Sequence, residues 1–391
     1  MNSKTIKLSF VGDIMCKAIQ NESCKEGVSY NYSGIFQQVC NELKSSDYLV
    51  GNLETPIAGE KLGYTSHMYS FNTPLQFAKE LVSSGFHLVT TANNHCLDRG
   101  TQGLMNTIDS LDSIGLSHIG TYASKQDRDA SFIVDIQGIR IAFLSYTYGT
   151  NAFVNHDYLM PEQKYMINLY QPQELLDGSI HLLQEMGQIS AQVEELYITD
   201  NDLYKQSIRP YLKQLEEDIL RYKSGNVDYT IMCMHSGGQY NVDPDSYTLQ
   251  LADWMYDVGI DAIIGCHPHV VHPCEVRRGR PIAYSLGNFT TSLGINPLEQ
   301  GTDSEYSIML NLYLNKENQK TMLEKIGFSV LKTVMNPDKS SKVVLVYDLI
   351  NQCSEPLERE KLIEQNQVIV NKFRGHEHSE IQPLKEYTLY Y

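Results

Sequence analysis

Strand-like apolar segments alternate with helix-like segments along the first 115 residues, and this alternation strongly limits the folds open to the chain. The runs take turns in the order strand, helix, strand, helix, strand, helix, at residues 6–11, 34–43, 47–50, 74–82, 87–92 and 104–114. Consecutive strands joined through a helix form right-handed βαβ units with parallel strands. The pattern therefore predicts an α/β fold with a mainly parallel sheet.

The rest of the chain adds further strands and helices around a polar excursion. A hairpin is predicted at 131–136 and 139–146, and residues 149–226 are rich in Gln, Glu and Tyr, with helical patterns at 174–186 and 203–222. This excursion either covers a site or serves as a packing appendage. The remaining predicted elements are strands at 228–234 and 261–264, a helix at 246–258, a hairpin at 274–276 and 281–284, strands at 306–314 and 328–334, and a helix at 356–373, followed by a polar tail.

Composition excludes several classes of protein. With 391 residues, 42% hydrophobic and 20% charged, the chain can bury a sizeable core. Its formal net charge of −16 disfavours nucleic-acid binding. No segment has the apolar length of a signal peptide or a membrane span, so we expect a cytoplasmic protein. The 8 cysteines are scattered without a CxxC pair, which favours small buried side chains over disulfides or zinc ligands.

Polar side chains with metal-binding chemistry follow several of the predicted strands. Two histidines, His267 and His269, come directly after the apolar strand at 261–264. Alone they are more often part of an ordinary surface turn, but other strand ends carry matching groups, and open α/β sheets bind ligands at this edge. The complete set of strand-end residues is Asp13, Asn52, Glu54, Asn94, His95, His235, His267 and His269.

Carboxylate, amide and imidazole ligands together suit one or two divalent ions such as Mn²⁺, Fe²⁺ or Zn²⁺. Two neighbouring ions can bind an anionic ester and lower the pKa of a bridging water. The residues alone therefore predict a metal-dependent hydrolase.

Six sequence motifs follow one another along the chain, at residues 10–13, 51–56, 92–100, 234–237, 265–269 and 284–289. In this order they resemble the capsule synthesis (CapA-like, poly-γ-glutamate synthesis) branch of the calcineurin-like metallophosphoesterases. They lie within residues 5–290, which we expect to be the motif-bearing core of a single domain covering 1–391, with a helical insertion at about 150–226 and C-terminal strands and a helix at 300–374. The resemblance implies a sandwich of two mixed β-sheets flanked by helices, with metals at the strand ends.

The resemblance also implies roles for individual residues. Asp13 and His269 would hold one ion, and Asn94, His235 and His267 the other. Glu54 would bridge them, and His95 would stabilise the transition state or protonate the leaving group. Residues expected to support the site are Asn52, Asp98, Arg99 and Asn288.

Two positions depart from the superfamily pattern. Met15 stands where ordinary members have a histidine, so we expect the ion at His269 to bind more weakly. Ser236 stands where the branch usually has an aromatic residue.

Three functions remain open at this point. The first is a phosphoesterase-type hydrolase acting on an anionic small molecule or polymer. The second is a non-catalytic accessory protein in capsular poly-γ-glutamate synthesis or export, which binds polymer or partner subunits. The third is a hydrolase of a carboxamide or γ-glutamyl bond that uses the same metals.

Overall fold

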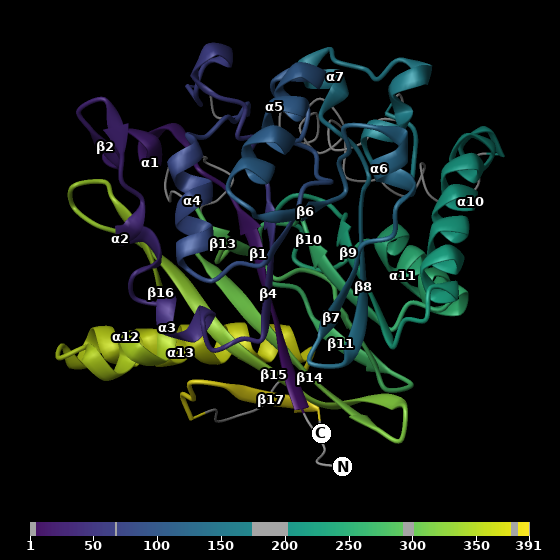
Figure 1. Ribbon diagram of the computed structural model, residues 1–391. Helices are drawn as coiled ribbons and strands as arrows, with labels where there is room; N and C mark the ends of the chain where they lie inside the picture. Colours follow the sequence, from purple (N-terminus) through teal and green to yellow (C-terminus); the bar gives the residue numbers. More distant parts are fainter. Residues whose placement is uncertain (1–4, 67–68, 174–201, 292–300, 377–381, 391) are drawn as a thin grey trace.

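Two mixed β-sheets pack face to face in the computed structural model, with helices on their outer faces (Figure 1). The structure describes residues 5–66, 69–173, 202–291, 301–376 and 382–390. The sandwich expected from the sequence is confirmed. The predicted helix at 174–186 lies outside the described residues.

The first sheet has the order β16-β15-β14-β1-β4-β5-β6, with β13 pairing with β1 and β17 with β15. Strands β1, β4, β5 and β6 run parallel, whereas β14, β15, β16 and β17 are joined antiparallel. The bounds are β1 (Thr5–Ile14), β4 (Tyr48–Leu53), β5 (Leu88–Thr90), β6 (Ser117–Ile119), β13 (Asn288–Thr290), β14 (Tyr306–Glu317), β15 (Lys320–Met335), β16 (Ser341–Leu345) and β17 (Tyr387–Tyr390).

The second sheet has the order β11-β12-β10-β9-β8-β7. Its central strands β8, β9, β10 and β12 are parallel, and antiparallel strands stand at both edges. The bounds are β7 (Ile133–Ile136), β8 (Ile139–Thr147), β9 (Tyr229–His235), β10 (Ala262–Cys266), β11 (Cys274–Arg277) and β12 (Arg280–Ala283).

Central strands are buried on both faces because each sheet lies between its partner and a helical layer. In β1, Leu8 and Phe10 point into the core between the sheets, whereas Val11 and Ile14 join the core beneath the outer helices. Since successive side chains of a strand alternate between faces, nearly every residue of these strands must be apolar or small.

Helices cover the outer faces of both sheets (Figure 1). Residues of α2 (Ser33–Phe36) and α4 (Leu75–Ser83) pack on the first sheet, and residues of α10 (Asp202–Ser224) and α11 (Ser246–Val258) pack on the second. The other described elements are α1 (Ala18–Ser23), β2 (Lys25–Glu26), β3 (Ser29–Tyr30), α3 (Cys40–Leu43), η1 (Glu60–Leu62), α5 (Gly100–Ser113), α6 (Lys125–Asp129), α7 (Ala152–Asn155), η2 (Pro161–Met166), α12 (Val346–Gln352) and α13 (Pro356–Arg374).

The continuous helix predicted at 34–43 is wrong, because the chain forms two short turns, α2 and α3, instead. Between them the Val39 amide donates to the Phe36 carbonyl, a tighter turn than an α-helix makes. This turn keeps Ile35, Phe36 and Val39 all buried. The polar tail also contains a strand, β17, that the sequence pattern did not indicate.

All 8 cysteines are free, as expected, and all but Cys40 and Cys353 are buried. Among the described helices, none combines the length and the apolar character needed to cross a membrane.

Candidate metal centre

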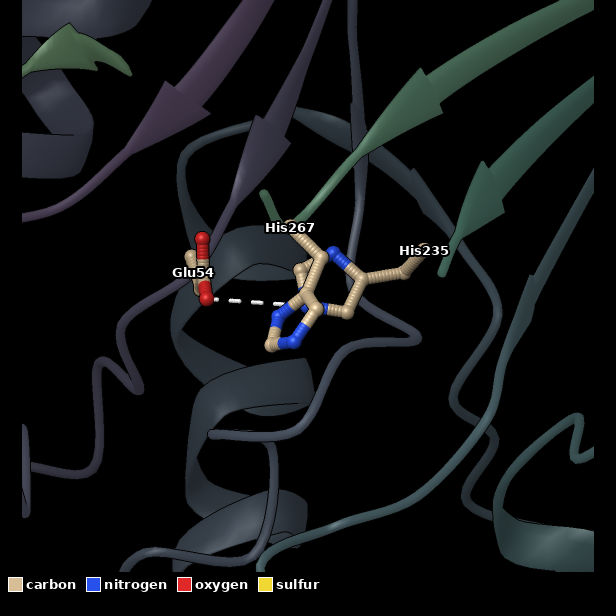
Figure 2. Close-up of side chains that lie close together, drawn as sticks. All are labelled: Glu54, His235 and His267. Carbon is tan, nitrogen blue, oxygen red and sulfur yellow. Dashed lines mark ion pairs between the residues drawn. The ribbon is translucent and has the colours of Figure 1, made fainter. Parts of the chain in front are cut away.

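Strand ends from the two sheets meet at one buried site. Asp13 lies near the end of β1, Glu54 follows β4, His235 ends β9, and His267 and His269 follow β10. Figure 2 shows Glu54, His235 and His267 pointing toward one another from three separate segments. The strand-end residues that the sequence analysis singled out are therefore brought together by the fold.

Two groups of three side chains have the spacing of metal-ligand sets. Glu54, His235 and His267 form one group, and Asp13, Glu54 and His269 form the other. Within each group, one potential ligand atom per residue lies within 4.8 Å of the others, and all these residues are buried. Glu54 belongs to both groups, which is the position of a bridging ligand.

The Glu54 carboxylate is the strongest sign that the site holds cations. Its side chain is fully buried, and neither oxygen accepts a hydrogen bond from any described residue. Oε1 lies 3.6 Å from Nε2 of His235 and 3.9 Å from Nε2 of His269. Burial, with the negative charge of Asp13 adding to it, raises the pKa of Glu54 well above its usual value. A buried carboxylate without donors is costly, so this donor set fits divalent ions.

Asp13 is held by donors on all sides. Burial alone would raise its pKa, but the hydrogen bond from His269 and the nearby histidines lower the pKa to about 2. Asn52 Nδ2 donates to Oδ1 at 2.8 Å, and the His267 backbone amide donates to Oδ2 at 3.1 Å. Asp13 is therefore ionised and fixed in place.

His269 has partners on both sides of the centre. Its Nδ1 lies 3.3 Å from Asp13 Oδ2 and 2.9 Å from Asn288 Oδ1, while its Nε2 faces Glu54. Asn288 therefore supports the site by contacting a candidate ligand. His267 and His269 have φ of 104° and 60°, a region that side-chain-bearing residues rarely adopt and that recurs at functional sites.

His235 meets two amide side chains. Its Nε2 lies 2.9 Å from Asn94 Oδ1, and its Nδ1 lies 3.3 Å from Asn52 Nδ2. Burial lowers the pKa of His235 to about 3, despite the opposing charge of Asp13. The imidazole is therefore neutral, the form that binds metals.

His95 stands next to Asn94 and pairs with a carboxylate. Its Nδ1 lies 2.7 Å from Asp98 Oδ2, and its ring packs against Phe71. Asp98 also accepts from the Phe71 amide at 2.6 Å and from Asn155 Nδ2 at 3.1 Å. These contacts fix the orientation of the His95 ring.

Arg99, the remaining predicted supporting residue, contacts the loop beside the site and none of the candidate ligands. Its guanidinium donates to Ser70 Oγ and to the backbone carbonyl oxygens of Gly63 and Asp98. Arg99 thus anchors this loop near Phe71, which packs on His95.

Close backbone approach explains why a glycine precedes Asp13. A Cβ at Gly12 would lie 1.8 Å from the carbonyl oxygen of Gly287, and the Asp13 amide donates to that same oxygen at 3.0 Å. Any side chain at position 12 would push β1 away from the loop before β13 and would move Asp13.

The sequence analysis missed three residues beside the centre, all following β8. The Tyr148 ring lies 4.6 Å from the His267 ring and is stacked on His235 at 6.1 Å. Asn151 accepts a hydrogen bond from Asn94, and Asn155 donates one to Asp98. The strand-end rule applied to residues 139–146 would have pointed to this segment. The start of the polar excursion therefore lies at the site.

A family model and several known proteins match most of the chain. The family model described as bacterial capsule synthesis protein PGA_cap matches residues 7–292. Capsule biosynthesis protein CapA of Bacillus anthracis is 27% identical over 348 residues, covering 87% of this chain and 71% of that protein. PGA biosynthesis protein CapA of Bacillus subtilis is 26% identical over 313 residues, covering 78% and 68%.

The solved structures that align with this chain include one phosphoesterase. The calcineurin-like phosphoesterase YfkN from Bacillus subtilis aligns with 94% of this chain and 99% of that chain, with a TM-score of 0.48 and 13% sequence identity.

Proposed function

This chain belongs to the bacterial capsule synthesis protein family, and on that premise we propose that it is a metal-dependent hydrolase of the phosphoesterase type. The observation that carries the proposal is the buried Glu54 carboxylate, which accepts no hydrogen bond from the described residues and lies between two candidate ligand sets. A purely structural core would not keep such a group, because burying an unsatisfied charge is costly.

In this proposal the ligands divide between two ions. Asp13 and His269 would hold one, Asn94, His235 and His267 would hold the other, and Glu54 would be shared between them. Mn²⁺, Fe²⁺ or Zn²⁺ bound there would supply Lewis acidity and lower the pKa of a coordinated water. With Met15 at a position where the superfamily pattern has a histidine, the ion at His269 would have fewer protein ligands and lower occupancy.

In this proposal His95 is the general acid. The Asp98 carboxylate engages Nδ1, which leaves Nε2 as the ring nitrogen available to a substrate. In the charged form, His95 donates the Nε2 proton to the leaving oxygen of an anionic ester. Phe71 and the Asp98 contacts keep the ring from rotating away.

The names of the related proteins favour a second candidate function. Those proteins are named for capsule or PGA biosynthesis, so this chain is also a candidate accessory protein that binds an anionic polymer or partner subunits. Hydrolysis of a carboxamide or γ-glutamyl bond is a third candidate, since the same ligands serve it.

Metal analysis combined with a substrate screen distinguishes these functions. Elemental analysis of the purified protein and of His267→Ala is followed by assays with Mn²⁺ on phosphomonoesters, phosphodiesters and γ-glutamyl amides. The hydrolase proposal requires stoichiometric metal in the parent chain and a rate that His95→Ala and His267→Ala both reduce. Metal without activity on any substrate class, together with polymer binding, favours the accessory role.

A further inference from the structure

A pocket lies between α6, η2 and α10. Figure 1 shows α6 and α10 on the same side of the molecule. Its volume is about 290 Å³, near the lower end of small-molecule sites. None of the candidate metal ligands lines it. The pocket is therefore a site separate from the metal centre.

Positive side chains gather at this pocket although the whole chain carries a net charge of −16. Lys125, Arg128 and Lys164 line it, and Asp129 is the one acidic residue among the described lining residues. Both lysines are exposed, and the Arg128 guanidinium is already paired with the buried carboxylate of Asp218. The two ammonium groups are therefore the charges available to a ligand.

The two lysines differ in their contacts. Lys164 Nζ lies 3.3 Å from the Tyr211 hydroxyl oxygen and 5.7 Å from the centre of the same ring. The side chain of Lys125 forms no hydrogen bond or ion pair with any residue in the described part of the chain. Because no described carboxylate pairs with its ammonium group, Lys125 is positioned to attract an anion.

Flat and apolar side chains form much of the remaining lining, together with the amides of Asn168 and Gln214. Tyr165, Tyr211, Leu169 and Pro210 contribute rings and aliphatic surface. Such surface favours an organic body over a fully hydrated inorganic ion. Asn168 also lines the pocket, but its Nδ2 donates to the Tyr122 hydroxyl at 2.9 Å and to the Ser145 carbonyl at 3.1 Å. Its role is to hold the wall in place.

We propose that this pocket binds a small aromatic oxyanion, with the rings against Tyr165, Tyr211 and Leu169 and the anionic group between Lys125 and Lys164. The pairing of a flat apolar lining with two exposed cations identifies this class of ligand. Neither a neutral aromatic molecule nor inorganic phosphate satisfies both parts of the pocket.

Calorimetric titration of the full chain with 2-naphthoate tests the proposal, with 2-naphthol as the neutral analogue and inorganic phosphate as the anion alone. We expect 2-naphthoate to bind more tightly than either analogue. The double variant Lys125→Ala/Lys164→Ala should weaken it by about fivefold to tenfold, as expected for two solvent-exposed charge contacts. Added salt should weaken it as well.

Two control variants locate the binding. Lys213→Ala removes an exposed lysine of α10 that does not line the pocket and forms an ion pair with Glu217, and it should leave the affinity unchanged. His267→Ala, at the metal centre, should leave it unchanged too. Three outcomes would each overturn the proposal. The double variant could bind 2-naphthoate as tightly as the parent does, 2-naphthol or phosphate could bind the parent as tightly as 2-naphthoate does, or 2-naphthoate could fail to bind at millimolar concentration. Matching melting temperatures of the double variant and the parent exclude a folding defect as the cause of weaker binding.

Discussion

Asn94 donates a hydrogen bond from Nδ2 to Oδ1 of Asn151 at 3.2 Å, and this contact fixes which end of the Asn94 amide faces the metal centre. With Nδ2 engaged, Oδ1 points to His235 Nε2 at 2.9 Å. An amide can bind a metal only through its oxygen, so the partner at position 151 selects the ligating orientation. Asn151 belongs to the excursion, which therefore contributes to the site.

Replacing Asn151 should weaken metal binding without removing a ligand. Asn151→Gly is the suitable variant, because Asn151 has a φ of 52°, which glycine adopts without strain. We expect the affinity for Mn²⁺ to fall about tenfold, the lower end of the effect of losing a ligand's hydrogen-bond partner. Calorimetric titration of the metal-free protein with Mn²⁺ measures the change.

Asn151→Asp provides the matched control, since its carboxylate still accepts from Asn94 Nδ2. It should keep an affinity close to that of the parent chain. Equal metal affinity in the glycine variant would mean that Asn94 needs no orienting partner.

Asp98→Asn should separate proton transfer from metal binding. The carboxylate contacts His95 Nδ1 at 2.7 Å and accepts hydrogen bonds from the Phe71 amide and Asn155 Nδ2, and none of these partners is a candidate metal ligand. For any ester that the protein hydrolyses, we expect kcat to fall by about 10- to 100-fold with unchanged metal content, less than the roughly 100- to 10,000-fold contribution of a general acid itself, because Asp98 only positions that acid.

The comparison variant for this test is His95→Ala, which removes the proton donor itself. If Asp98 acts only through His95, the double variant Asp98→Asn/His95→Ala should be no slower than His95→Ala alone. Additive losses, or loss of metal in Asp98→Asn, would assign Asp98 a role other than positioning His95.

Glu54→Gln should stabilise the metal-free chain while abolishing its response to metal. The buried carboxylate has no donors among the described residues, and Gln removes its charge at nearly constant volume. We expect the unfolding free energy of the metal-free variant to equal that of the metal-free parent or to exceed it by on the order of 1 kcal/mol. Calorimetry with a chelator and then with excess Mn²⁺ measures both effects.

Metal binding to the native state raises the melting temperature of the parent chain by linkage, and this rise should vanish in the variant. Glu60→Gln, at an exposed position in η1, should behave like the parent. A variant that is less stable than the parent in chelator would show that Glu54 makes favourable contacts without any cation.

Much of the fold follows from periodicity, and the exceptions are short. The predicted helix at 246–258 coincides with α11, because Leu251, Ala252 and Met255 recur at helical spacing and face the core. Strands such as β6 and β13 have three residues each, too few to show an alternation. The chain turns between α2 and α3 because burying the neighbouring side chains is more favourable there than continuing the helix. No local sequence pattern reveals this balance.

The centre was predictable where a residue's position follows from the end of a strand. Asp13, Glu54, His235, His267 and His269 converge because parallel strands of two packed sheets end at the same edge. Asn151 and Asn155 were not predictable, because the path of the chain after β8 places them, and loop residues carry no periodic signal. In the sequence, Asn151 and Asn155 look like ordinary polar loop residues. Only their contacts with Asn94 and Asp98 show that they belong to the site.

A half-buried carboxylate helps to hold the C-terminal strand, which also pairs with β15. Glu386, next to β17, accepts from Asn311 Nδ2 at 2.7 Å and from the Tyr313 hydroxyl at 2.8 Å, and it pairs with Lys325. Burial alone would raise the pKa of Glu386, but its contacts with Lys325 and Tyr313 lower this pKa from 4.5. The charged carboxylate therefore fastens the tail to β14 and β15.

Glu386→Gln should lower stability in a way that depends on pH. A carboxyl whose pKa is depressed in the folded state stabilises the protein above its unfolded pKa of 4.5, and this contribution disappears as pH falls through the lower native pKa. We expect the variant to lose about 1 kcal/mol of unfolding free energy at pH 7, a modest value because the pair is partly exposed to solvent. The difference in unfolding free energy from the parent should shrink below pH 4.5, as measured by urea unfolding across this range.

Glu364→Gln, at an exposed position of α13, is the control, and its unfolding free energy should differ little from that of the parent at any pH. A loss of equal size at acidic and neutral pH would mean that packing around residue 386, and not its charge, holds β17 in place.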